Sequence, residues 1–497
     1  MMNSESDMKR YQMYIDGDWV DAEGGAVFES LNPATAQPWA LMPEASEADV
    51  ERAVRAADRA LREGDWAGMS ATARGKMLFR LADLLAEHAE ELGSVETLDS
   101  GKLARETQSQ ALYIADYYRY YGGLADKIEG ATLPIDKPGM HVYTRREPIG
   151  VVAAIVPWNA QMFLTATKLG PALAAGNTVV LKASEGGPAP MLEFARLVEE
   201  AGFPKGVVNI ITGFGEPCGR ALTSHPLVAR IAFTGGPEAA KHVVRNSAEN
   251  FAHVTLELGG KSPIMVFEDA DLESAVNGII AGNFGASGQS CVAGSRVLLH
   301  ESIHDQVVES LTERARNIRI GDPLDADTQM GPLATEAQVL HIERAVTETI
   351  AAGGKLACGG KRPEGLAGWY YEPTILICDD PAMPTVEDEM FGPVMSVLKF
   401  KDETEALALA NNTSYGLGAG VFTRDIARAM RVSEGVHSGI VWVNTYRVIS
   451  PIAPFGGFKR SGYGRESGLQ AIEDYTRTKS VWINTSDEPM ADPFVMR

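Results

Sequence analysis

Hydrophobic and polar residues change their periodicity several times along the chain. The segment after Ser46 has apolar residues at a helical spacing, and Ser46 itself can cap the helix. Two longer amphipathic stretches follow, 71–92 and 94–120, and we expect the second to break near Gly101. Upstream, Asp16-Gly17 separates two short apolar segments and predicts a β-hairpin. The N-terminal quarter therefore predicts a few short strands followed by packed helices.

A regular alternation of strands and helices begins near residue 149. Its first segment, 150–156, is an apolar run typical of a buried parallel strand. The strands that follow are expected at 177–182, 207–212, 228–234 and 253–258. The helices between them are expected at 163–174, 190–201, 215–224 and 237–248. This order predicts a doubly wound α/β domain with a nucleotide site at the carboxyl ends of its strands.

A second alternation follows the paired glycines 259–260, which predict a hinge between two domains. Its strands are expected at 262–267, 295–299, 418–423 and 440–444. Its helices are expected at 272–284, 303–317, 403–411 and 426–432. We expect the intervening segment 320–400 to be rich in loops.

Two segments far apart in the chain, 128–148 and 475–497, alternate like exposed strands. A strand pair that protrudes from a domain has open edges, which need covering. The pattern predicts strands whose edges are covered by another part of the structure, or an ordinary surface hairpin.

Composition narrows the class of protein. A chain of 497 residues has room for about three domains. The net charge of −21 argues against non-specific binding to nucleic acid or to an anionic membrane. The four cysteines are scattered and form no C-x-x-C pair, so we expect no metal site and no disulfide framework. Residues 1–12 lack an apolar secretory signal, and we expect a cytoplasmic protein.

Three motifs supply a thiol, a carboxylate and an amide. They are Gly288-Gln289-Ser290-Cys291, the stretch 254–261 that contains Glu257, and Pro157-Trp158-Asn159. A thiolate attacks carbonyl carbon, an amide N–H stabilises the resulting oxyanion, and a carboxylate activates water to hydrolyse a thioester. Taken singly, each residue has an ordinary interpretation: Cys291 as a buried thiol, Glu257 as a solvated acid and Asn159 as a turn residue. Their combination predicts thiol-based oxidation of an aldehyde.

In this order and spacing the motifs resemble those of the aldehyde dehydrogenase superfamily, whose marks are P-W-N, E-L-G-G-K and G-Q-x-C. The resemblance extends from Tyr14 to Val481. It implies that Cys291 is the nucleophile, that Asn159 and the Cys291 N–H hold the oxyanion, and that hydride leaves to nicotinamide. It also implies that Glu257 is the base for hydrolysis. Acylating relatives that use coenzyme A lack this glutamate, so a free acid is the expected product.

The resemblance also implies an NAD site. The segment 213–219 reads G-x-G-x-x-x-G, which is looser than the usual dinucleotide fingerprint. In the resembled family the pyrophosphate lies at the next strand–helix junction, here Phe233, Thr234, Gly235 and Gly236, the last of which is Ser in many relatives. The other expected cofactor contacts are Val156, Pro157, Trp158, Lys182, Ser184, Glu185, Gly215, Leu258, Glu389 and Phe391. The Glu185 carboxylate would accept hydrogen bonds from ribose hydroxyls but would repel a 2′-phosphate. We therefore expect NAD as the cofactor, with NADP a poorer alternative.

By the same resemblance, the helix after Asn159 and the segment before residue 456 line the path of the aldehyde. The expected contacts are Met162, Leu164, Thr167, Val448, Ile449 and Phe455. Thr167 replaces a bulky aromatic of many relatives, and Arg447 could meet a distal carboxylate or pair with an acid at an interface. The substrate is therefore expected to be an aromatic or ω-functionalised aldehyde. Lys168 is expected to be structural or to tune the thiol.

The expected architecture is an aldehyde dehydrogenase-like α/β fold. The NAD-binding domain comprises 1–127 and 149–258, the catalytic domain 259–474, and the arm 128–148 and 475–497. The arm implies a homodimer or homotetramer. Two other classes remain: a non-catalytic binding protein, which would not need all three catalytic groups, and a thiol hydrolase or acyltransferase, which would not need a dinucleotide domain.

Overall fold

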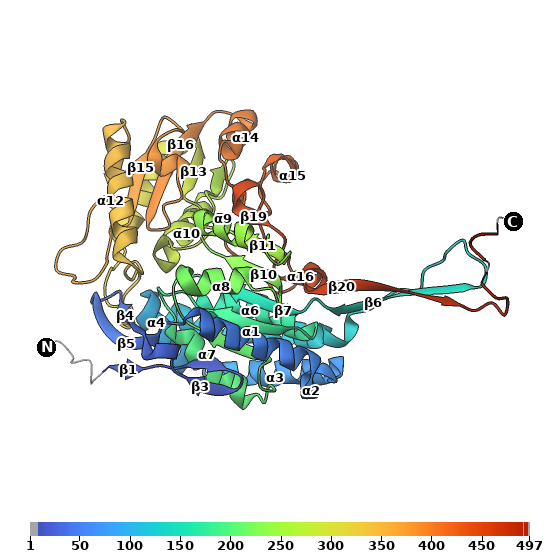
Figure 1. Ribbon diagram of the computed structural model, residues 1–497. Coiled ribbons are helices and arrows are strands. Elements are labelled where there is room, and N and C mark those ends of the chain that lie inside the picture. The colour runs from blue at the N-terminus through green and yellow to red at the C-terminus, as the bar shows by residue number, and fades with distance from the viewer. Residues whose placement is uncertain (1–7, 491, 496–497) are drawn as a thin grey trace.

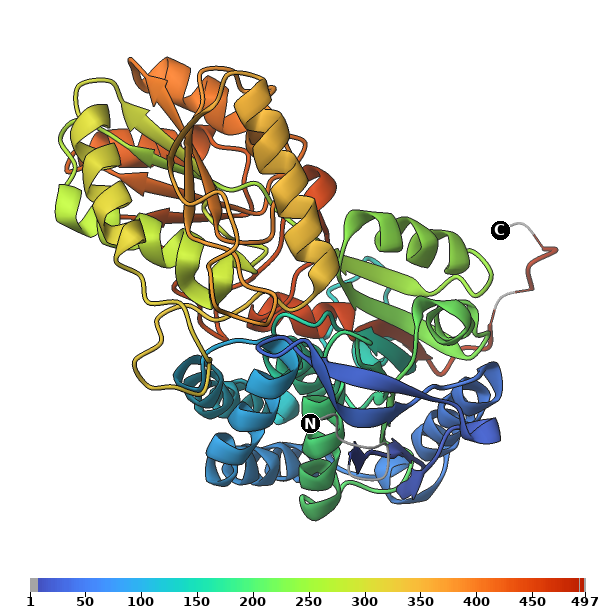
Figure 2. The ribbon, with the colours of Figure 1, turned by 90° about the vertical axis from the view of Figure 1, so that its left-hand side faces the viewer.

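The computed structural model describes residues 8–490 and 492–495 and is organised around two large sheets, each covered by helices (Figures 1 and 2). The eight-stranded sheet has the order β19 (Gly462–Tyr463), β11 (His253–Glu257), β10 (Val228–Thr234), β7 (Val151–Ile155), β8 (Thr178–Lys182), β9 (Val208–Ile211), β2 (Met13–Ile15) and β3 (Asp18–Val20). Its five strands from β11 to β9 are parallel, which confirms the doubly wound α/β fold.

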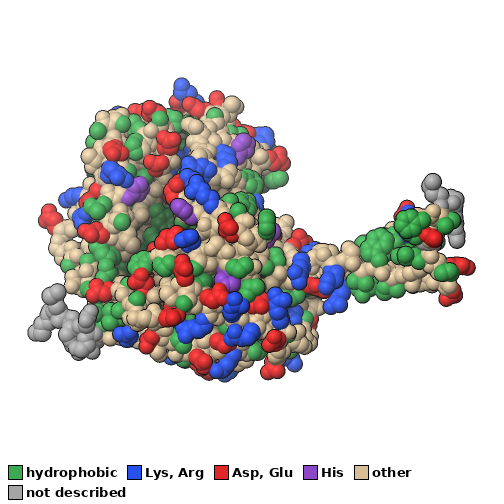
Figure 3. Space-filling model, viewed as in Figure 1, with side chains coloured by type: hydrophobic (Ala, Val, Ile, Leu, Met, Phe, Trp, Pro, Cys, Tyr) green, Lys and Arg blue, Asp and Glu red, His purple; other side chains and the backbone are tan. Residues whose placement is uncertain are grey.

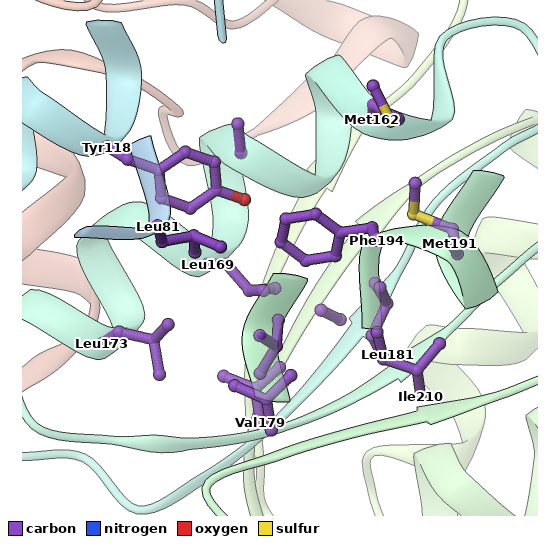
Figure 4. Close-up of a cluster of buried hydrophobic side chains, with 14 of the residues drawn as sticks. Leu81, Tyr118, Met162, Leu169, Leu173, Val179, Leu181, Met191, Phe194 and Ile210 are labelled. Carbon is purple, nitrogen blue, oxygen red and sulfur yellow. The ribbon is translucent and has the colours of Figure 1, made fainter. Parts of the chain in front are cut away.

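Side chains of successive residues in β7 point to opposite faces of this sheet. Val152 and Ala154 pack against one helical layer, whereas Val151, Ala153 and Ile155 pack against the other. The first layer contains α3 (Ala71–Glu87), α4 (Ala89–Ser100), α5 (Ala104–Leu124), α6 (Gln161–Ala174) and α7 (Ala189–Glu200). The second contains α1 (Glu47–Arg62), α8 (Arg220–Ser224) and α9 (Pro237–Asn246). Figure 4 shows part of the hydrophobic cluster of the first layer, in which Phe194, Leu169 and Tyr118 pack in the same cluster as the side chains of β8.

The seven-stranded sheet has the order β14 (Lys355–Cys358), β15 (Thr374–Ile377), β16 (Val394–Phe400), β13 (Arg296–His300), β12 (Pro263–Val266), β17 (Gly418–Phe422) and β18 (Ile440–Val443). One face packs on α10 (Leu272–Phe284) and α11 (His304–Arg316). The other packs on α12 (Glu336–Ala351), α14 (Glu403–Asn411) and α15 (Ile426–Gly435). The strand β19 follows these elements in the chain but returns to the first sheet, where it pairs with β11.

An arm projects from the body (Figure 1). It consists of β6 (Met140–Pro148) and β20 (Thr476–Asn484), antiparallel over nine residue pairs. Figure 3 shows apolar side chains along the arm and basic side chains where it leaves the body. Trp482 and Ile483 are 57% and 42% exposed, a high exposure for large apolar residues on a strand.

Local signals placed several elements correctly. Ser46 caps α1 through a capping box with Asp49, the Asp16-Gly17 turn joins β2 to β3, and Gly101 ends α4 in a left-handed conformation with φ 73°. The remaining short elements are β1 (Lys9–Arg10), β4 (Val27–Asn32), β5 (Gln37–Pro43), α2 (Gly64–Ala67), α13 (Pro384–Glu387) and α16 (Gly468–Asp474).

Two sequence-based expectations are wrong, and a third is incomplete. The segment 320–400 is loop-rich, as expected, but it also contains α12, α13, β14, β15 and β16; its strands are only four to seven residues long and give weak periodicity. The helix expected at 71–92 ends at Glu87, since His88 leaves helical geometry (ψ 14°) although the apolar spacing continues past it. The helix expected at 215–224 becomes regular only at Arg220, because Glu216 is extended.

Candidate active site

Cys291 lies in the loop that connects α10 to β13. The turn before it, Gly285–Gly288, contains Ala286 and Ser287 in the left-handed region at φ 53° and 54°. Such conformations cost about 1–3 kcal/mol per non-glycine residue and persist where surrounding contacts hold them. Here the Ser287 hydroxyl donates to Gly331 O at 2.9 Å, and Ala334 N donates to Gln289 Oε1 at 2.8 Å. The loop is therefore fixed from both sides, and Cys291 is half-buried at its end.

Asn159 lies beside this loop although it is more than 100 residues away in the chain. Its Nδ2 donates a hydrogen bond of 3.0 Å to the carbonyl of Gln289, two residues before the thiol. An amide N–H₂ has two protons. One proton makes the bond to Gln289, which orients the Asn159 amide beside the loop of Cys291.

Glu257 ends β11, and its side chain is buried with neither carboxylate oxygen hydrogen-bonded. Burial, followed by the nearby Glu466 carboxylate, raises the pKa of Glu257 well above its usual range, while Lys168 and Arg465 oppose the shift. The unsatisfied oxygens leave Glu257 free to bind water. Its raised pKa moves the group toward the range in which a carboxylate is an effective base.

A buried network adjoins Glu257. Lys168 of α6 forms an ion pair with Glu466, and both side chains are almost fully buried. The Lys168 amine also donates to Thr234 Oγ1 at 2.7 Å, and Thr167 Oγ1 lies 2.8 Å from the second Glu466 oxygen. A buried charge pair of this kind is maintained only when its remaining hydrogen-bonding capacity is satisfied. The network joins α6, β10 and the segment before α16 next to the Glu257 carboxylate.

Two adjoining cavities meet at this point. The cavity around the thiol has a volume of about 270 Å³ and is bounded by Asn159, Leu164, Glu257, Leu258, Cys291, Glu389 and Phe391, among others. The second, of about 410 Å³, follows the carboxyl ends of the first sheet. Both are lined by Pro157, Trp158, Thr234, Gly235 and Gly236, so the cavities adjoin. Trp158 and Phe391 meet edge to face at the junction, with ring centroids 5.3 Å apart.

Burial favours the uncharged forms of the ionisable groups near the thiol. It raises the pKa of Cys291 to about 12, with the Glu389 and Glu257 carboxylates adding to the shift and Arg447 opposing it. It raises the pKa of Glu389 to about 7, although the N–H of Gly260 donates to this carboxylate at 3.0 Å. It lowers the pKa of Lys261 to about 7. The thiol is therefore protonated in this state, and its ionisation requires a base or added positive charge.

Comparison with known proteins identifies the arrangement. The model of the aldehyde dehydrogenase family matches residues 19–481.

The chain belongs to the aldehyde dehydrogenase family.

Similar proteins include a dehydrogenase from Acinetobacter baylyi that is named for (Z)-2-((N-methylformamido)methylene)-5-hydroxybutyrolactone. It is 57% identical over 491 residues, which is 99% of this chain and 100% of the relative. An aldehyde dehydrogenase from Bacillus cereus, solved as an NAD⁺ complex, is 42% identical with a TM-score of 0.94 over 96% of this chain and 97% of its own. PnpE from Pseudomonas sp. WBC-3 is 44% identical with a TM-score of 0.95 over 98% and 99%.

Within this aldehyde dehydrogenase fold, the expected cofactor residues lie along the two cavities. The larger cavity contains Val156, Pro157, Trp158, Lys182, Ser184, Glu185, Gly215, Phe233, Thr234, Gly235 and Gly236. The smaller contains Leu258, Glu389 and Phe391. Gly259 makes room for Glu389, because a Cβ on Gly259 would lie 1.9 Å from a Glu389 oxygen.

The residues expected along the substrate path are dispersed. Leu164 lines the cavity around the thiol, and Phe455 packs in the same hydrophobic cluster as Cys291. Met162 instead belongs to the hydrophobic core of the first layer (Figure 4), and the Thr167 hydroxyl meets Glu466. The backbone carbonyl of Ile449 accepts from the Tyr113 hydroxyl at 2.7 Å. Neither Met162 nor Thr167 is among the residues that bound the thiol cavity.

Arg447 has a structural partner that the sequence did not suggest. Its Nη1 donates to the carbonyls of Ala281 at 2.9 Å and Gly285 at 3.3 Å, at the end of α10. The neighbouring Tyr446 is buried and donates to Val292 O at 2.9 Å. Both side chains therefore stabilise the segments that flank Cys291.

Sequence reasoning missed several residues of the site. Glu466 lies about 300 positions from Lys168, and Gln338 and His341 reach the thiol cavity from α12, in the segment expected to be loop-rich. In the larger cavity, the missed residues are Ile155, Glu216, Gly219, Arg220, Thr223, Ala239, His242, Val243 and Asn246. An apolar spacing over 336–351 could have revealed α12, but no local signal connects Glu466 to α6.

The described part of the chain has neither a metal-binding cluster nor a membrane-spanning helix. Residues 8–490 and 492–495 contain no cluster of three or more His, Cys, Asp or Glu side chains arranged for a metal ion. In the same residues, no helix combines the length and apolarity needed to cross a bilayer.

Proposed function

We propose that the protein oxidises an aldehyde to the carboxylic acid with NAD, through a thioester on Cys291 that Glu257 helps to hydrolyse. The observation that carries this proposal is the convergence of Cys291, Asn159 and Glu257 on one cavity that adjoins a second cavity of about 410 Å³. A binding protein has no need for an unpaired buried carboxylate opposite a thiol. A thiol hydrolase has no need for the second cavity.

The residues support each step of this chemistry. Cys291, as the thiolate, attacks the aldehyde carbon, and the free proton of the Asn159 amide and the Cys291 N–H meet the developing oxyanion. NAD, when bound, supplies the hydride acceptor. Glu257 then takes a proton from water, the hydroxide attacks the thioester carbonyl, and the carboxylic acid leaves as Cys291 is regenerated.

The larger cavity fits NAD in its chemistry. Gly236, which lines this cavity, precedes α9 without a side-chain cap, so the backbone N–H groups of Glu238 and Ala239 in the first turn are available to a pyrophosphate, whereas Pro237 has none. Lys182 and Glu185, 3.5 Å apart, offer a donor and an acceptor to ribose hydroxyls. The NAD⁺ complex of the Bacillus cereus relative supports the same ligand for this chain.

For the substrate we propose aldehydes that carry a distal carboxylate or its ester equivalent. The Acinetobacter baylyi relative is named for a 5-hydroxybutyrolactone. Such a ring is the cyclic tautomer of a 4-oxo acid, and its opening, which consumes no water, gives a chain with an aldehyde at one end and a carboxylic acid at the other. This class falls within the ω-functionalised aldehydes expected from the sequence.

The test is the appearance of reduced nicotinamide at 340 nm with a 4-oxo acid, a medium-chain alkanal and benzaldehyde, with NAD and NADP in parallel. We expect the highest kcat/KM with the 4-oxo acid and NAD. A higher value with the alkanal would contradict the substrate class. Absence of turnover with every aldehyde would contradict the proposed reaction.

Glu185→Gln should raise kcat/KM for NADP by about fivefold. The side chain is 45% exposed, so the repulsion between its carboxylate and a 2′-phosphate is about 1 kcal/mol in partly screened surroundings. NAD kinetics should change little, because glutamine still accepts a ribose hydroxyl. Glu200→Gln, outside both cavities, is the matched control. An unchanged NADP value in Glu185→Gln would show that another group excludes the phosphate.

We also propose the domain limits 1–127 with 149–258, 259–474, and 128–148 with 475–497 for the arm. The exposed Trp482 and Ile483 support a homodimer or homotetramer assembled through the arm of a cytoplasmic enzyme. Light scattering on the intact protein should give two or four times 53.4 kDa, and a monomer mass would contradict this assembly.

A further inference from the structure

The far end of the larger cavity is a slot between α8 and α9. Gly219 forms one wall, Ala239 and Val243 form the other, and Thr223 and Asn246 lie in the same lining. If the pyrophosphate is at Gly236 and the ribose at Lys182 and Glu185, this slot is the part of the cavity left for the purine. The inference therefore rests on the proposed NAD site. Its apolar walls can pack on the faces of a purine, whereas the polar side chains of Thr223 and Asn246 can contact only the edge of the ring.

Hydrogen bonds within the slot fix the orientation of the Asn246 amide. Thr223 is 1% exposed, and its hydroxyl donates to the carbonyl of Gly219 at 2.8 Å, with Arg220 O at 3.2 Å. Its single proton is thereby used. It accepts from Asn246 Nδ2 at 2.9 Å. A flipped amide would place two acceptors, Asn246 Oδ1 and the Thr223 oxygen, against each other. This could be avoided only if the Thr223 hydroxyl stopped donating to the carbonyl of Gly219.

With the amide held in this way, Asn246 Oδ1 is left without a donor among the described residues, and Asn246 lines the cavity. We propose that Asn246, oriented by Thr223, selects a 6-amino purine over a 6-oxo purine in the dinucleotide. The exocyclic amine of adenine donates to Oδ1. The carbonyl oxygen of hypoxanthine at the same position would face Oδ1 with no proton between them.

Calorimetric binding of NAD⁺ and of nicotinamide hypoxanthine dinucleotide tests the proposal without any need for turnover. The wild-type protein should bind NAD⁺ about tenfold more tightly, the size of one net neutral hydrogen bond. Asn246→Leu, which keeps the volume but lacks the amide, should bring the ratio of the two Kd values to near one by weakening NAD⁺. Thermal melting of each variant checks that it is folded.

Thr223 supplies the matched pair of variants. Thr223→Val keeps the shape but frees the amide to flip, so the preference should disappear, mainly by tighter binding of the hypoxanthine analogue. Thr223→Ser retains the hydroxyl and should retain the preference. Equal affinities in the wild type, or a preference unchanged in both Asn246→Leu and Thr223→Val, would overturn this inference alone. Failure of the wild type to bind either dinucleotide would overturn the NAD proposal itself.

Discussion

Cys291→Ala should lower kcat/KM for aldehyde oxidation by at least about 10³-fold. The other groups of the site cannot form the covalent adduct, and removal of a nucleophile from a catalytic unit typically costs several orders of magnitude. The side chain is only half-buried, so its loss should leave the fold and NAD affinity close to those of the wild type. The measurement is steady-state turnover at 340 nm beside calorimetric NAD binding.

Cys358→Ser is the matched control. Cys358 is also a free cysteine, is buried in the second sheet and donates weakly to Pro373 O, a bond that serine can replace. It should retain near wild-type turnover. If Cys291→Ala kept more than about a tenth of the activity, the thioester mechanism would be excluded. If Cys358→Ser lost as much as Cys291→Ala, the effect would reflect structure rather than chemistry.

Glu257→Gln should separate formation of the thioester from its hydrolysis. We expect a burst of reduced nicotinamide close to the enzyme concentration, followed by a steady state about 10²–10⁴-fold slower than that of the wild type, the usual contribution of a general base. Glutamine is nearly isosteric, and the carboxylate it replaces makes no hydrogen bond that would be lost. Stopped-flow absorbance gives the burst, and intact-protein mass spectrometry should show an acyl group on Cys291.

The outcome without a burst is also informative. Glu257 raises the pKa of Cys291, so its neutral replacement should make the thiol more acidic. Loss of both the burst and the steady state would therefore mean that Glu257 acts as the base that deprotonates the thiol, against its assignment to hydrolysis alone. A wild-type steady state would remove Glu257 from the mechanism.

The pH dependence of the wild type follows from the same carboxylate. Burial and Glu466 raise the pKa of Glu257, and only its deprotonated form accepts a proton from water. Hydrolysis should therefore weaken as the pH falls through this raised pKa, at a higher pH than for an exposed glutamate. Glu257→Gln should lack this limb of the profile.

The sequence by itself determined the elements that depend on near neighbours and the identity of the reacting groups. Ser46 and Asp49 cap α1 by bonds three residues apart, and Gly101 ends α4 because glycine enters the left-handed region at low cost. Apolar runs predicted the five parallel strands of the first sheet. The thiol, carboxylate and amide were recognisable because their motifs are continuous in the chain.

Only the tertiary structure decided how these groups act together. Glu466 meets Lys168 across about 300 residues, Arg447 holds the end of α10, and Asn246 meets Thr223 across two helices. None of these pairings leaves a periodic pattern, since each depends on how separate elements pack and not on local conformation. The same packing buries Glu257 and leaves both of its carboxylate oxygens without a hydrogen-bond partner. It is this desolvation, and not the residue type, that raises the pKa of Glu257.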